Sequence, residues 1–243
     1  MDKALQHRSP LITAFCVALA LVLVWPIWIA AHNGLSGLYA RPAIDYLEGK
    51  RLDAYTVSEA QWQALENNLV QADQLMPGNP EYLQALGLLQ QLKLDMHDDE
   101  LSIEQKDAHA SAAKDYFQKA VENRPTWPYY WGNLALEHYR SGSYATDEFS
   151  QALANAGRFG PWKNDTQRLV IDLGSETWEF LSPPARREFI LSVERGLRRQ
   201  PKNTALIIGG DGAWPAFCEA SRALPDMALP HLLTLCENER FAE

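Results

Sequence analysis

The sequence predicts an all-α protein, made of an N-terminal transmembrane helix followed by a short α-solenoid of about three to four helix pairs. Three observations predict it. Residues 10–31 are apolar without one charged side chain. Leu, Ala, Gln and Glu dominate the rest of the chain, and runs of β-branched residues are scarce. A pattern of apolar residues at helical spacing, closed by a proline, recurs along the soluble part.

Length and charge limit the classes of function. The chain has 243 residues, which accommodates one membrane anchor and one domain of roughly 200 residues. The formal net charge is −9 and the isoelectric point is near 5.2. Binding to phosphates depends on clustered Lys and Arg, so this acidic balance argues against nucleic acid as the main partner.

Residues 10–31 have the length of a membrane span, because about 20 apolar residues cross the hydrocarbon core as a helix. Lys3 and Arg8 precede this run, and the next basic residue is Arg41. The positive-inside rule therefore puts residues 1–9 in the cytoplasm and the soluble part on the far side. A cleaved signal peptide is the alternative, since Ile29, Ala30 and Ala31 resemble a cleavage site. The apolar run exceeds the usual 7–15 residues of such peptides, which favours a retained anchor.

Residues 32–57 are expected to form a linker, or alternatively a short helix and a loop. Gly34, Gly37, Pro42 and Gly49 interrupt any long periodicity there, and no chemistry is visible. The helical domain is then expected over residues 58–224, with a C-terminal tail at 225–243.

The helical domain is predicted from one clear helix–turn–helix template. Small alanines allow two helix axes to approach, large apolar residues fill the space between them, and a proline ends the helix. The template residues are Ala113, Phe117, Ala120, Pro125, Trp131 and Leu134. This spacing is typical of a tetratricopeptide (TPR) unit.

An earlier copy of the template contains Leu65, Leu69, Ala72 and Pro77, and Pro77 and Pro125 are 48 residues apart. A plain TPR has a period of about 34 residues, so about 14 are inserted. Because 14 residues are close to four helical turns, we expect two lengthened helices and no loose loop. A third, weaker copy ends at Pro201. The helices are expected near residues 58–76, 80–96, 103–123, 127–140, 145–156, 163–180, 184–199 and 213–223.

Motifs that resemble chemical sites lack their companions. Ser111 and Lys114 have the spacing of a Ser-x-x-Lys pair, but no Ser-Asp-Asn or Lys-Thr-Gly element accompanies them. Residues 97–100 (HDDE) with His109 lack the spacing of a metal site, and residues 209–212 (GGDG) lack the Gly-Lys-Ser/Thr of a phosphate loop. We therefore predict no catalytic residue, no metal site and no cofactor.

Three cysteines remain. Cys16 lies in the apolar run, where a thiol behaves as a small apolar side chain. Cys218 and Cys236 either pair, which an oxidising compartment allows, or remain two buried thiols. Pairing would close a loop of roughly 18 residues and add about 3 kcal/mol in the chain-entropy model.

Residues 127–162 are rich in aromatic side chains. Tyr129, Asn133, Leu136 and Arg140 fall on one helical stripe, and this stripe faces the concave groove in TPR units. Exposed aromatic residues and arginines favour interfaces, so the predicted partner-binding residues are Tyr129, Asn133, Leu136, Arg140, Trp127 and Trp162. One further feature stays open: Arg195, Arg198 and Arg199 form either a basic cluster for an acidic partner or membrane headgroups, or a solvated helix end. His138 is expected in the core.

From about residue 110 to 218 the chain resembles the VpsP-type proteins of bacterial exopolysaccharide gene clusters. The resemblance is carried by residues 124–129 (RPTWPY), 131–135 (WGNLA), 160–162 (GPW) and 194–201 (ERGLRRQP). It covers a little under half of the chain. It implies a single-pass inner-membrane protein with a periplasmic helical domain that acts in polysaccharide assembly or export, and it implies no enzymatic role.

The leading hypothesis is a membrane-anchored TPR adaptor that binds a protein partner in a polysaccharide synthesis or export complex through its groove. A periplasmic chaperone or assembly factor, for example in c-type cytochrome maturation, is the second hypothesis. The third is a glycan-processing enzyme, for which the candidate carboxylates are Glu137, Asp147, Glu148, Asp172 and Glu176. An exposed aromatic groove is also compatible with a homo-oligomer.

Overall fold

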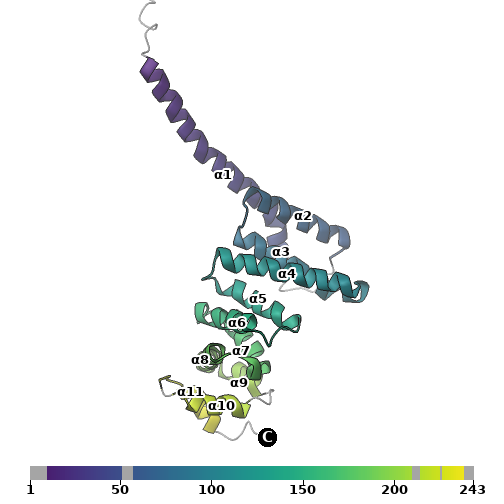
Figure 1. The fold of residues 1–243 in the computed structure, drawn as a ribbon, viewed down its shortest axis with the longest axis vertical. Helices are drawn as coiled ribbons and strands as arrows, with labels where there is room; N and C mark the ends of the chain where they lie inside the picture. Colours follow the sequence, from purple (N-terminus) through teal and green to yellow (C-terminus); the bar gives the residue numbers. More distant parts are fainter. Residues whose placement is uncertain (1–9, 51–56, 210–213, 225, 238–243) are drawn as a thin grey trace, which may run out of the picture. The chain divides into compact units, whose positions relative to one another are not determined.

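The structure is a computed structural model of the chain, and it describes residues 10–50, 57–209, 214–224 and 226–237. Every regular element in these ranges is a helix, so the all-α prediction is confirmed for the part of the chain that the structure describes. The chain divides into two compact units, Met1–Ala85 and Leu86–Glu243, which are described in turn (Figure 1). The helical domain expected at 58–224 extends over both units, since α2 (Glu59–Leu75) belongs to the first unit.

Helix α1 (Pro10–Lys50) is a single helix of 41 residues (Figure 1). Its apolar first half is exposed, with Phe15, Leu21 and Ile27 each about 67 % accessible. The helix is long and apolar enough to cross a membrane, a property that it shares with signal sequences. Residues 1–9, the predicted cytoplasmic segment, lie outside the described residues.

The linker expected at 32–57 is helical as far as Lys50, and residues 51–56 lie outside the described residues. The physical reason lies in one face of this segment. Ser36, Ala40 and Ala43 are buried, and α1 packs here against α2 (Glu59–Leu75). Packing against α2 thus keeps this segment helical, although its glycines and Pro42 disfavour a helix locally.

Helix α2 begins with a capping box, in which the Ser58 side chain accepts from the Gln61 N–H and the Gln61 side chain accepts from the Ser58 N–H. Trp62, Leu69 and Ala72 are its buried residues. The start of helix α3 (Pro80–His97) also belongs to the first unit, where the Tyr82 hydroxyl lies 3.1 Å from the Ser36 hydroxyl.

The second unit contains the rest of α3 and a succession of helices. In chain order these are η1 (Asp98–Glu100), α4 (Ile103–Asn123), α5 (Pro128–Arg140), α6 (Asp147–Phe159), α7 (Asn164–Glu176), η2 (Trp178–Phe180), α8 (Pro183–Arg199), α9 (Pro201–Gly209), α10 (Trp214–Arg222) and α11 (Pro230–Glu237). Helix α5 packs on α6 and α7, α7 packs on α9, and α6 packs on α8 (Figure 1). Helices α5, α7 and α9 therefore form one row, and α6 and α8 form the other.

Of the six template residues, Ala113, Phe117, Ala120 and Leu134 are buried, whereas Trp131 is half-buried and Pro125 is exposed. Ala113, Phe117 and Ala120 are fully buried. A glycine on the neighbouring helix makes room for the Phe117 ring, because a Cβ on Gly87 would lie 2.5 Å from Phe117 Cε1. The inserted residues lengthen helices: α3 has 18 residues and α4 has 21, whereas α5, α6 and α7 have 13 each.

Two helices were not expected. Helix α9 begins at Pro201 and α11 begins at Pro230. The repeat pattern predicts Pro201 only as the end of the preceding helix, although proline also suits the first helical position, where a backbone N–H would have no intrahelical partner. The expected helix 163–180 ends at Glu176 and is followed by the 3₁₀ turn η2, while the expected tail at 225–243 contains α11.

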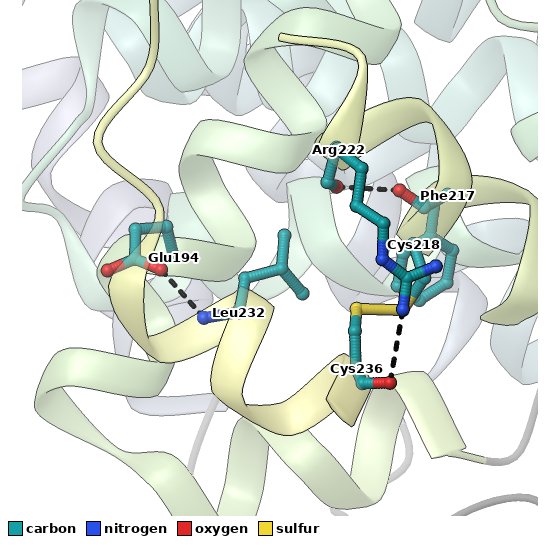
Figure 2. Close-up of a disulfide and its surroundings, with 7 residues drawn as sticks. Glu194, Phe217, Cys218, Arg222, Leu232 and Cys236 are labelled. Atoms are coloured by element: carbon teal, nitrogen blue, oxygen red, sulfur yellow. Dashed lines mark hydrogen bonds between the residues drawn. A yellow bond between two sulfur atoms is a disulfide. The ribbon is translucent and has the colours of Figure 1, made fainter. Parts of the chain in front are cut away.

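Cys218 and Cys236 form a disulfide, with their Cα atoms 5.8 Å apart (Figure 2). The bond joins α10 to α11. Glu194 of α8 holds the beginning of α11, because its carboxylate accepts from the backbone N–H of Leu232 at 2.8 Å and from His231 Nδ1 at 2.7 Å. The last two helices are thus fastened to each other covalently and to α8 by a capping carboxylate.

Candidate functional site

The predicted groove residues of α5 share one face but differ in exposure. Tyr129, Asn133 and Leu136 are half-buried, and Arg140 is exposed. The Arg140 guanidinium lies 3.1 Å from the Asp95 carboxylate of α3. The charge of Arg140 is therefore balanced within the protein. The groups that this face offers to a partner are chiefly aromatic rings and an amide.

The two predicted tryptophans lie at different places. Trp127 precedes α5 and is half-buried, with the Arg124 guanidinium 4.2 Å from its ring centroid and Tyr129 at 5.8 Å. Trp162 lies between α6 and α7 and is 54 % exposed. It contacts α8 instead, because the Arg198 guanidinium lies 5.0 Å from its ring and Arg199 Nη1 donates to its carbonyl oxygen at 3.0 Å.

Beneath the α5 face lies a buried polar layer. Glu137 is 1 % exposed, and Gln91 Nε2 donates to its carboxylate at 2.8 Å. Burial raises the pKa of Glu137, although the Gln91 hydrogen bond and the charge of Arg140 act in the opposite direction. Burial also lowers the pKa of His138, and the nearby Lys114 adds to this effect. His138 is buried, as predicted. In both groups burial stabilises the neutral form relative to the charged form.

The other candidate carboxylates are exposed. Asp147 and Glu148 lie in the first turn of α6, and Asp172 and Glu176 lie on α7. The Tyr139 hydroxyl donates to Glu176, and this hydrogen bond raises the pKa of Tyr139. Surface carboxylates at a helix N-terminus have an ordinary role in stabilising the helix dipole, and Glu176 is engaged by a tyrosine.

The basic cluster considered for Arg195, Arg198 and Arg199 does not form as a unit. The Arg195 guanidinium lies 2.7 Å from Glu188 in a largely buried ion pair, whereas Arg198 and Arg199 are exposed. Ser111 is exposed and Lys114 half-buried on α4. The side chains of His97 and Asp98, and residues 210–212, lie outside the described residues. Within the residues that were described, no group of three or more His, Cys, Asp or Glu side chains is placed to hold a metal.

The structure also contains a cleft between α7, α8 and α9, with a volume of about 240 Å³. Two arginines and four carboxamides supply most of its polar groups: Arg168, Arg199, Asn164, Gln167, Gln200 and Asn203. Ile171, Leu206 and Ile207 form an apolar wall. None of the lining residues is acidic, so the cleft is a positive site on an acidic protein.

Hydrogen bonds fix the geometry around this cleft. Gln167 is buried and its Nε2 donates to the Pro161 carbonyl at 2.8 Å, which holds the turn that carries Trp162. The hydrogen bond from Arg199 Nη1 to the Trp162 carbonyl uses one nitrogen of the guanidinium, and the remaining N–H donors are available to a ligand. Arg168 makes no ion pair or hydrogen bond with any of the residues that the structure describes.

Sequence reasoning missed this cleft, although it considered Arg199, which lines the cleft, and Trp162, whose carbonyl accepts from Arg199. Arg168 and Arg199 are far apart in the sequence, and they meet because α7 packs against α8 and α9. Asn203 lies on α9, a helix that was not expected. The available signal was the spacing of Asn164 and Arg168, which are four residues apart on α7 and thus share one helical face. Arg199 ends α8 and Asn203 lies on α9, so no helical periodicity links these two residues.

Comparison with known proteins adds no assignment: no family model matches the sequence, and no curated protein matches it.

Proposed function

We propose that this protein is a membrane-anchored binding module whose helical domain lies outside the cytoplasm and binds a protein partner. One combination of features carries the proposal. The same chain has an exposed apolar helix of membrane-spanning length and a disulfide in its helical unit. Disulfides persist in oxidising compartments, so the two features together support an anchor in the membrane and a domain on its oxidising side.

The helical unit is proposed to be a TPR-like solenoid. Support comes from the two rows of helices, α5–α7–α9 and α6–α8, and from the burial of the template residues Ala113, Phe117, Ala120 and Leu134. Stacked helix pairs of this kind present one row of helices along an extended binding surface. In this chain that row includes the α5 face and the cleft between α7 and α9.

The partner is proposed to belong to a polysaccharide synthesis or export complex of a bacterial inner membrane. This part rests on the resemblance of residues 110–218 to VpsP-type proteins. The residues proposed to bind are Tyr129, Asn133, Leu136, Arg140, Trp127 and Trp162. The half-buried aromatic groups among them supply contact area at little entropic cost.

The test is site-specific photocrosslinking in membranes that contain the full chain. A photoreactive residue replaces Trp162 in one sample and Tyr129 in another, and a matched control carries it at Gln151, an exposed position on α6 in the other row. The proposal predicts that one discrete protein is captured from Trp162 and Tyr129 and not from Gln151. Equal capture from all three positions would contradict a binding role for this row, and a broad set of unfolded proteins would favour the chaperone.

A further inference from the structure

The polar groups of the α7–α8–α9 cleft determine which ligand charge it accepts. Arg168 and Arg199 are both exposed and both line it, and no acidic side chain lines it to balance them. A guanidinium presents several N–H donors in a plane, which matches the two oxygens of a carboxylate. The cleft therefore favours a ligand with a carboxylate.

The carboxamides determine what surrounds that carboxylate. Asn164, Gln200 and Asn203 are exposed at the cleft. Each carboxamide has both a donor and an acceptor, as a peptide group does, so a row of them can pair with the backbone of an extended chain. The apolar wall is the third element. Leu206 is 79 % exposed, so its side chain is accessible to an apolar group of a ligand in the cleft.

We propose that this cleft binds an extended peptide segment in which a carboxylate stands next to an apolar side chain. The arginines bind the carboxylate, the carboxamides bind the backbone, and Leu206 with Ile207 contacts the apolar side chain. The inference rests on the proposed function for the statement that the partner is a protein, and it adds the chemical class of the segment and the place where it binds.

An acidic saccharide is the competing occupant, because carboxamides and arginines also suit sugars. Saccharide sites commonly offer an aromatic ring for stacking, since a ring face is apolar. Trp162 does not line the cleft, and the Arg198 guanidinium lies over its ring at 5.0 Å. The wall that does line the cleft is aliphatic, which fits a peptide side chain better. At about 240 Å³ the cleft is smaller than pockets for drug-sized ligands, roughly 300–1,000 Å³, so it holds only part of a longer segment.

The experiment measures fluorescence anisotropy with the full chain in detergent. The probes are labelled hexapeptides that contain one leucine beside one aspartate, placed internally or at the C-terminus, and matched probes with asparagine and an amidated end. The expected result is that removal of the carboxylate weakens binding about tenfold or more, since hydrogen bonds to charged groups are among the stronger ones. Comparison of internal and terminal probes shows whether the carboxylate comes from a side chain or a chain end.

Variants assign the binding to the cleft. Arg168→Gln is expected to weaken binding of the aspartate probe about tenfold and to leave binding of the asparagine probe unchanged. Leu206→Ala is expected to weaken binding of both probes. Arg158→Gln is the matched control, because it removes an exposed arginine from α6, which does not line the cleft. All three residues are exposed, so the variants are expected to fold.

The inference is overturned if neither probe binds, if both bind equally, or if Arg158→Gln weakens binding as much as Arg168→Gln. It is also overturned if oligogalacturonate displaces the peptide from wild type and binds more tightly than any peptide probe. The two proposals are tested separately. If the photoreactive residue at position 162 still captures a discrete partner in the Arg168→Gln chain, the proposed binding module stands and the cleft is not its binding site.

Discussion

The disulfide between α10 and α11 allows one prediction to be worked out in detail. These two helices contact each other, and α11 contacts α8. The perturbation is the double substitution Cys218→Ala and Cys236→Ala, compared with wild type under oxidising and reducing conditions. Alanine at 218 suits the site, because Cys218 is buried with 4 % exposure and a hydroxyl there would lack solvent.

The magnitude follows from the length of the closed loop. The two cysteines are 18 residues apart, and the chain-entropy model assigns such a loop about 3 kcal/mol at 25 °C. This corresponds to about a hundredfold change in the equilibrium between closed and locally opened states. The contacts of Glu194 with His231 and Leu232 remain in the variant, so α11 is expected to loosen without losing its position in the folded state.

Hydrogen exchange followed by mass spectrometry is the appropriate assay, because helices at the end of an array can open without global unfolding. Amides in residues 214–222 and 230–237 are expected to exchange up to a hundredfold faster in the variant and in reduced wild type. Amides in α5 and α6 are expected to be unchanged. Unaltered exchange in α10 and α11 would refute the account of how this end is held, and faster exchange in α5 as well would show that the disulfide stabilises the whole unit.

Three further predictions concern the core and the surface of the second unit. Burial raises the pKa of Glu137 above its ordinary value of 4.5, so the folded chain keeps a proton that the unfolded chain releases. The free energy of unfolding is therefore expected to fall as the pH rises from about 4.5 through the raised pKa. Urea unfolding at several pH values should show this fall in wild type and a flatter profile in Glu137→Gln. Gly87→Ala is expected to cost about 1–3 kcal/mol in urea unfolding, because the new methyl group meets the Phe117 ring, and an unchanged midpoint would disprove the close packing. Arg140→Ala is expected to cost less than about 1 kcal/mol in the same assay, because its ion pair with Asp95 is exposed, and a larger loss would show that this pair is structural.

The sequence predicted most helices because their signals are local. Ser102 with Gln105 forms a capping box at the start of α4, and Arg124 follows its end, so the expected range 103–123 agrees with the observed Ile103–Asn123. The buried template residues, such as Phe117, also follow from periodicity within one helix.

The features that the sequence did not predict depend on tertiary contacts or on residues that can either end or begin a helix. The glycines and Pro42 of residues 32–50 usually break a helix, yet α2 covers one face of that segment and keeps it helical. Pro201 both ends α8 and begins α9, and the local pattern shows only one of these roles.

The candidate site was the hardest to predict. Spacing placed Tyr129, Asn133, Leu136 and Arg140 on one face, but it gave no indication that Asp95 neutralises Arg140. Side-chain pairing between distant helices is not encoded in a periodicity. The cleft is a similar case, because Arg168 and Arg199 come together only once α7 and α8 have packed.

The most direct test of the central claim examines where the two parts of the chain are in bacterial cells that express it. Membranes are washed with alkaline carbonate, and the washed protein is treated with a polyethylene glycol maleimide before and after reduction, in a Cys16→Ala background. An anchored, extracytoplasmic module is expected to stay in the membrane pellet at full length, with Cys218 and Cys236 labelled only after reduction. Release of the chain into the wash, or labelling of both cysteines without reduction, would contradict the account.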